Sequence, residues 1–148
     1  MESAEFDPYL DRLIRTYAED RIRSGQWAAE GGLAEPRKEV EKLLPVGLQT
    51  PSHFLYTFVR GSREEKVGVV WLAREPRGGF VSDLLIFDSF RRQGYAEEAM
   101  RVLEDVAKEK GIRKRSLYEF GDNLGARRPY AKLGYVETNV VMSKTLTP

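Results

Sequence analysis

One short stretch of the chain passes directly from a strand pattern, through a turn, into a helix pattern. The apolar residues 84–87 are typical of a buried strand, and residues 94–110 repeat apolar side chains at helical spacing. Gly94 and Ala96 lie at the junction, where small side chains let a ligand approach the backbone. Because the first amides of a helix have no partner within it, they can bind an anion, and two arginines add charge. The junction therefore predicts a pyrophosphate site. Its residues are Arg91, Arg92, Gln93, Gly94, Tyr95 and Ala96.

Two other phosphate-binding patterns are absent from the chain. Neither G-x-x-x-x-G-K-[ST] nor G-x-G-x-x-G occurs. The pattern that remains, R-x-x-G-x-A, is short, and it also fits a basic turn followed by an ordinary helix. Taken alone, it leaves both interpretations open.

Periodicity and chain-breaking residues predict the remaining elements. Asp7 can cap the first predicted helix, and Pro8 suits its first position. The predicted helices are residues 7–23, 36–44, 94–110 and 124–133, and the predicted strands are residues 53–60, 66–74, 80–87, 115–120 and 135–146. This order predicts an α/β (α+β) fold with three layers. A central mixed, mostly antiparallel sheet is flanked by helices in a single domain, residues 1–148.

Composition narrows the function classes. The net charge of +1 gives no general attraction to nucleic acid or membranes. Residues 1–46 carry 7 basic and 10 acidic side chains, and residues 91–132 carry 11 and 7, so the basic excess lies at the predicted anion site. With no cysteine and one histidine, we expect no metal centre. No apolar run is long enough to span a membrane and no signal peptide is evident, so we expect a cytoplasmic protein.

A second motif follows in residues 121–135. Asn123, Ala126, Tyr130, Gly134 and Tyr135 match the pattern N-x-x-A-x-x-x-Y-x-x-x-G-F, with tyrosine in place of the last phenylalanine. In this region the chain resembles the GNAT family of N-acetyltransferases. That family also uses R/Q-x-x-G-x-G/A to hold the pyrophosphate of coenzyme A, which the first motif matches. The resemblance covers residues 53–146, whereas the N-terminal helices match only in number and position.

The resemblance implies a cofactor and a set of contacts. Acetyl-CoA is the expected co-substrate, with its pantetheine arm filling a gap beside the strand that ends at Ile86 and Phe87. Asn123, Ala126 and Tyr130 are expected to contact it as well. Independently of the family, Asn123 also fits a helix cap and Tyr130 also fits an ordinary core tyrosine.

Acetyl transfer to an amine requires a proton donor, an oxyanion donor and a neutral amine. The resemblance assigns the protonation of the departing thiolate to Tyr130. A backbone amide of the strand ending at Phe87 is the expected oxyanion donor. Asp83, Glu119 and Glu75 are candidate bases, and we rank Asp83 first because its strand presents the thioester.

The predicted function is therefore transfer of an acetyl group from acetyl-CoA to a primary amine of a small molecule or peptide. A non-catalytic acyl-CoA sensor on the same fold is the alternative. Residues 77–82 faintly resemble an RNA-binding strand, but the net charge and element order argue against nucleic acid. The acidic N-terminal half favours a cationic amine, unless these acids are only the solvated faces of helices. The sequence is compatible with a homodimer but does not fix the oligomeric state.

Overall fold

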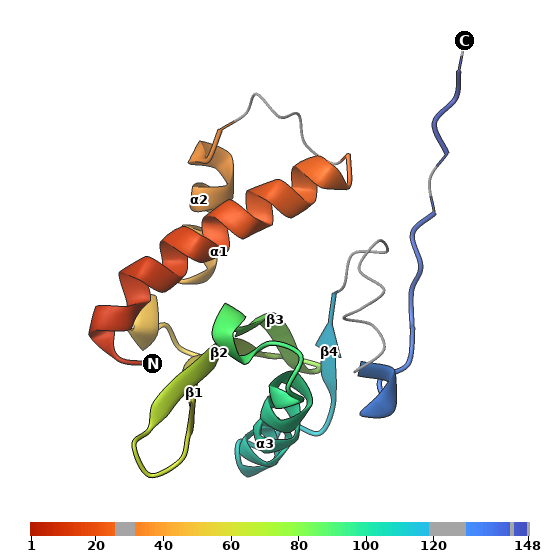
Figure 1. Ribbon diagram of the computed structural model, residues 1–148. Helices are drawn as coiled ribbons and strands as arrows, with labels where there is room; N and C mark the ends of the chain where they lie inside the picture. Colours follow the sequence, from red (N-terminus) through yellow and green to blue (C-terminus); the bar gives the residue numbers. More distant parts are fainter. Residues whose placement is uncertain (26–31, 119–129, 143, 148) are drawn as a thin grey trace.

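The computed structural model describes residues 1–25, 32–118, 130–142 and 144–147. Figure 1 shows helices α1 (Ser3–Arg23) and α2 (Ala34–Leu43) on one side of a sheet and α3 (Tyr95–Glu109) on the other. The sheet contains strands β1 (His53–Arg60), β2 (Glu65–Glu75), β3 (Gly78–Ile86) and β4 (Arg115–Leu117). Short 3-10 turns, η2 (Gly47–Gln49) and η3 (Asp88–Phe90), precede β1 and follow β3. The predicted three-layer architecture is confirmed.

The strands follow their order in the sequence. β1 pairs with β2 and β2 with β3, both antiparallel, because short turns return the chain at once. β4 is parallel to β3, since α3 carries the chain back to the same end of the sheet. The sheet is thus mixed and mostly antiparallel, as predicted.

A β-bulge changes the direction of the side chains in β3. Trp71 of β2 lies opposite Asp83, and Leu72 lies opposite Val81, so Ser82 is the extra residue. As a result Val81 and Leu84 both face α3, while Asp83 faces α1. The bulge therefore decides which side of the sheet receives the acidic side chain.

Each face of the sheet carries its own apolar core. The core under α1 and α2 consists of Tyr9, Leu13, Ile14, Val40, Leu44, Leu55, Val69 and Trp71. The core under α3 consists of Val70, Leu72, Val81, Met100, Leu103, Ala107 and Ile112. β2 contributes to both cores because its side chains alternate between two covered faces. This explains its nearly continuous burial from Val67 to Ala73.

α1 begins before the predicted first residue. Its N-terminus is a capping box in which the Glu2 amide donates to the Glu5 carboxylate at 2.7 Å. The prediction of a start at Asp7 was wrong, because the Asp-Pro signal lies within the helix. Pro8 removes one internal hydrogen bond there, but the capping box and the buried face of the helix hold the preceding turn.

The C-terminal part differs most from expectation. The predicted strand at residues 135–146 is wrong, because its described residues pair with no strand of the described chain. Residues 130–132 form the only described turn of the helix predicted at 124–133. Positions 119–129 lie outside the described residues, so β4 is described only to Leu117.

Candidate functional site

A cleft of about 230 Å³ opens between the end of β3 and the beginning of α3. It is lined by Leu84, Leu85, Ile86, Arg91, Ala96, Met100, Tyr130 and Leu133. Four of the residues predicted from the sequence, Ile86, Arg91, Ala96 and Tyr130, therefore meet around one cavity. Its walls are mostly apolar, which suits the uncharged arm of a ligand more than a polar one.

The end of β3 has an open edge on the cleft side. β4 pairs only with residues 79–81 of β3 in the described chain. On the other edge, the Phe87 amide donates to the Val67 carbonyl oxygen at 2.9 Å. Because antiparallel hydrogen bonds alternate, the amides of Leu84 and Ile86 then point away from β2, toward the open edge. An extended ligand could pair there as a strand does.

Gly68 in β2 allows this end of β3 to lie close to β2. A Cβ at this position would lie 2.2 Å from the Leu85 carbonyl oxygen. No real side chain tolerates that separation, so β2 and β3 approach each other here only because residue 68 is glycine.

The backbone before α3 forms a concave group of amides. Arg92 and Gly94 have φ values of +59° and +82°, both in the left-handed region. Such alternation turns successive amides toward one point, an arrangement that binds anions. The first bond within α3 runs from the Glu98 amide to the Gly94 carbonyl oxygen at 3.1 Å. The amides of residues 95–97 therefore have no partner within the helix, and Gly94 has no side chain that could cap them.

Side chains of the turn fasten it to the sheet. Arg91 Nε donates to the Ile86 carbonyl oxygen at 3.2 Å, and its Nη2 lies 3.1 Å from Asp88. Gln93 donates to the Ser89 carbonyl oxygen at 3.1 Å. Tyr95 turns away from the cleft toward β1, where its hydroxyl accepts from Arg60. The side chains of Gln93 and Tyr95 thus hold the turn in place and do not line the cleft.

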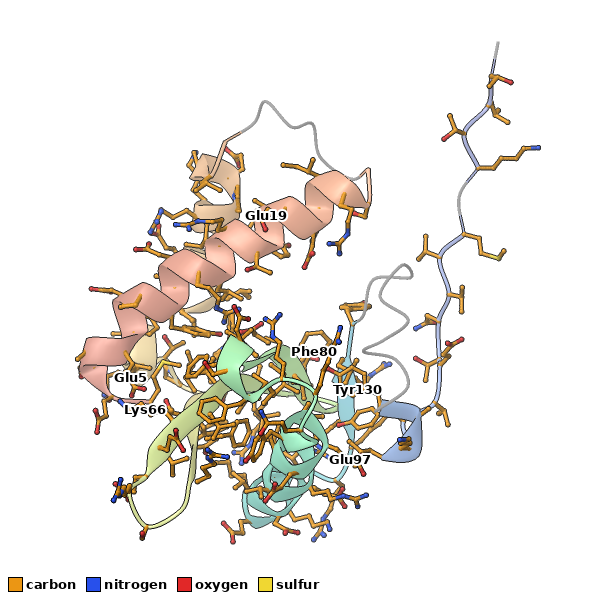
Figure 2. All side chains as sticks on the ribbon, in the orientation of Figure 1. Glu5, Glu19, Lys66, Phe80, Glu97 and Tyr130 are labelled. Atoms are coloured by element: carbon orange, nitrogen blue, oxygen red, sulfur yellow. The ribbon has the colours of Figure 1, made fainter. Side chains whose placement is uncertain are left out.

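Tyr130 closes the cleft on the side facing α3. Figure 2 labels it on the helical turn beside α3, and it packs against the core under that helix. Its ring meets that of Tyr135 edge to face at 5.8 Å between centroids. The Tyr135 amide donates to the Tyr130 carbonyl oxygen at 3.0 Å, which closes the turn. The position of Tyr130 is therefore held by packing and by the backbone.

Asp83 lies on the other face of the sheet and does not line the cleft. Its carboxylate accepts from Arg12 of α1 at 2.6 Å, and its side chain is 15% exposed. Arg12 also lies over the ring of Tyr9 at 5.1 Å. The Tyr9 hydroxyl is buried with no hydrogen-bond partner among the described residues. Burial, followed by the charge of Asp83, raises the pKa of Tyr9 well above its usual value.

Sequence reasoning missed Arg12 and Tyr9. They are three residues apart, so they share one face of α1, and helical spacing could have shown that much. The partner of Arg12 is 71 residues away, and no local signal identifies it. The site also draws on Met100 and Leu133, which the sequence marked only as apolar.

Other predicted residues lie elsewhere. Glu75 is exposed and pairs with Gly78, at the opposite end of the sheet from Ile86. The side chain of Phe87 packs into the core under α1 rather than into the cleft. Glu119, Asn123 and Ala126 lie outside the described residues.

His53 takes part in packing. The Trp71 indole nitrogen donates to His53 Nδ1 at 3.0 Å, beneath α1. Burial lowers the pKa of His53. In the described part of the chain, no group of acidic or histidine side chains is arranged to hold a metal ion. Nor does that part contain a helix with the length and apolar character needed to cross a membrane.

Comparisons with known proteins agree with this geometry. The model of the acetyltransferase (GNAT) family matches residues 15–135. YycN of Bacillus subtilis, an uncharacterized N-acetyltransferase, is 36% identical over 150 residues, which cover 99% of this chain and 96% of YycN. YdgE of the same organism, also an uncharacterized N-acetyltransferase, is 27% identical over 99% of this chain and 95% of its own length.

Solved structures show the same fold. The crystal structure of YycN superposes with a TM-score of 0.93 over 100% of this chain and 96% of that chain. An acetyltransferase from Pyrococcus furiosus, 21% identical, superposes with a TM-score of 0.62 over 94% of this chain and 95% of that one. The family model covers most of the chain and includes the end of β3, the turn before α3 and Tyr130. The chain therefore belongs to the GNAT family of acetyltransferases and is an acyltransferase enzyme.

Proposed function

We propose that this enzyme transfers an acetyl group from acetyl-CoA directly to a primary amine of a small molecule or peptide. GNAT enzymes generally use acetyl-CoA and act on amines. The observation that carries the proposal is the cleft. An open strand edge, a concave group of amides and a tyrosine meet around it.

The two ends of this cleft suit the two ends of the pantetheine-pyrophosphate arm. The left-handed residues Arg92 and Gly94 and the uncapped amides of residues 95–97 offer donors to a doubly charged pyrophosphate. The apolar side chains of Leu84 and Ile86 suit the uncharged arm. Their outward amides are free to pair with its amide groups, as one strand pairs with another.

The reaction itself needs little from the protein beyond placement and proton transfer. The amine nitrogen attacks the thioester carbonyl carbon, and the carbon–sulfur bond breaks. We assign the oxyanion donor to the Ile86 amide, because the neighbouring Phe87 amide is already bonded to Val67. Tyr130 donates its proton to the departing thiolate, and its ring contact with Tyr135 holds it in place.

The base that accepts the proton from the amine is assigned to Asp83. It lies on the strand that presents the thioester, on the face toward α1. Arg12 donates to its carboxylate and fixes its direction, so we assign a positioning role to Arg12. Glu75 is the weakest candidate, since it lies at the far end of β2.

The only feature of the chain that favours a cationic acceptor is the acidic excess in its N-terminal half. Two of these acids already have partners. Asp11 pairs with Arg37 at 2.9 Å. Glu5 pairs with Lys66 at 3.2 Å, and both residues are labelled in Figure 2. Such pairing weakens any long-range attraction for a cation. A preference for cationic amines must therefore come from acids that stay unpaired when the acceptor binds.

A panel of primary amines with acetyl-CoA, followed by release of free thiol, tests the proposal. We expect turnover with at least one amine. Matched cationic and anionic amines should differ in kcat/KM, with the cationic amine preferred and the difference shrinking as salt rises. Binding of acetyl-CoA without turnover on any amine would support the sensor function instead. A preference for anionic amines would refute the charge argument while leaving acetyl transfer intact.

A further inference from the structure

The C-terminal segment, residues 135–147, exposes an unusual amount of apolar surface. From residue 136 onward every described residue is exposed. Val141 is 97% exposed and Met142 89%. The other large apolar side chains of the segment that are exposed are Val136, Val140 and Leu146. A row of such side chains on one segment is typical of a surface that another molecule covers.

The composition of the segment favours a strand. Between residues 135 and 147 there is no glycine or proline, and valine and threonine make up six of the thirteen residues. These residues suit a pleated, half-buried position. An extended segment of this kind is stable only when its backbone pairs with another strand. The predicted strand is not formed here, because no strand of the described chain pairs with these residues.

An edge for such a partner exists on β4. β4 is the last strand of the sheet, and in the described chain nothing pairs with its outer side. Tyr118, directly after it, is 87% exposed, and its ring meets that of Phe80 edge to face at 5.4 Å between centroids. An open edge flanked by exposed aromatic surface is a template for strand addition.

The start of the segment directs it away from this edge. The turn after Tyr130 closes with Gly134 at a φ of +87° and with the Tyr135 amide on the Tyr130 carbonyl oxygen. Figure 1 shows the chain leaving the body of the protein from this point, in blue, and running outward to the C-terminus. The superposition on the crystal structure of YycN covers 100% of this chain at a TM-score of 0.93.

We propose that residues 135–147 of one copy pair with the β4 edge of a second copy, and that the exchange is reciprocal. Two identical contacts related by a two-fold axis then close the dimer without leaving a free edge. The apolar side chains that are exposed in one copy become buried in two equivalent interfaces. Because Tyr130 and Leu133 lie just before the exchanged segment, the dimer contact adjoins the cleft.

The absence of native cysteine allows a direct test of this pairing. Ser116→Cys on β4 is combined, in one chain, with Thr138→Cys, Val140→Cys or Met142→Cys in turn, since the register is not specified. Mild oxidation and non-reducing electrophoresis should give a band of dimer mass with at least one pair, and reductant should abolish it. A cross-link confined to single chains would show that the segment folds back on its own β4. That result, or no cross-link with any pair, would overturn the proposal.

The mass in solution supplies the second test. Light scattering should give twice the chain mass of 16.9 kDa for the wild type. Val140→Asp with Val141→Asp should yield monomers, because the buried strand would carry two charges. The matched control is Val102→Asp, at a 51% exposed valine on α3, which should remain dimeric. A monomeric wild type, a dimer that survives the double substitution, or a dimer broken by the control would refute the exchange.

Discussion

Gly94 offers the sharpest test of the proposed anion site. Its φ of +82° lies in the left-handed region, and a Cβ added there would meet nothing within 4 Å. Gly94→Leu should therefore lower stability through backbone strain alone, by about 1–2 kcal/mol. For a chain of this length, the melting temperature should fall by roughly 2–8 °C. The variant should still fold.

Gly111, just after α3, provides a matched control. Its φ is +75°, and a Cβ there also meets nothing within 4 Å. Gly111→Leu should lower the melting temperature by a similar amount, because the strain is the same. It lies at the other end of the helix from the cleft, so it should leave the affinity for acetyl-CoA unchanged.

The two variants should differ in binding. At Gly94 the leucine side chain enters the space that a ligand on the amides of residues 95–97 would occupy. Loss of one hydrogen bond to a charged group costs about 1.5–3 kcal/mol, which raises Kd roughly 10- to 150-fold. Calorimetry with acetyl-CoA, below both melting temperatures, measures this. If both variants bind acetyl-CoA as tightly as the wild type, the proposed site is refuted. If both lose the same amount of affinity, backbone strain is the cause and not the blocked site.

Four further outcomes follow from the structure. Tyr130→Phe should lower kcat by about 10²–10⁴-fold with little change in acetyl-CoA affinity, whereas Tyr135→Phe should not; an unchanged kcat, with chemistry rate-limiting, contradicts the assignment. Asp83→Asn should slow turnover and remove the acidic limb of the kcat/KM profile; a limb that survives points to another base. Gly68→Ala should cost about 1–3 kcal/mol in urea unfolding, since a Cβ would press on the β3 backbone, and a neutral result would disprove that contact. Burial lowers the pKa of His53, so this side chain binds a proton more readily in the unfolded chain than in the folded one. The free energy of unfolding should therefore fall as the pH drops below about 6.5. His53→Gln should remove that fall, as measured by thermal melts.

Local patterns predicted the central elements well. β1 was predicted at its observed bounds, and β2 and β3 differ from prediction by one or two residues at their ends. Alternation and turn glycines act over a few residues, so a single sequence contains the information. The start of α1 was missed because two capping signals compete, and the box at Glu2 and Glu5 is formed where Asp7 was expected.

The site was predictable to the extent that it is contiguous. The strand, the turn and the start of α3 follow one another within residues 84–96, so the pattern there named Ile86, Arg91 and Ala96 among the residues that line the cleft. The ion pair between Arg12 and Asp83 was not predictable, because it joins residues 71 positions apart. The bulge at Ser82 is equally hidden, yet it turns Asp83 toward α1.

The sequence by itself determined the central helices and strands, where the turn before α3 lies and which family the chain resembles. These properties depend on backbone preferences and side-chain periodicity, which act between near neighbours. The tertiary structure alone decided the direction of Asp83, its pairing with Arg12 and the opening of β3 on the side facing the cleft. It also decided that residues 135–147 lack a partner strand within the described chain. Strand pairing and ion pairing join residues distant in sequence, so only the folded chain brings them together or leaves them apart.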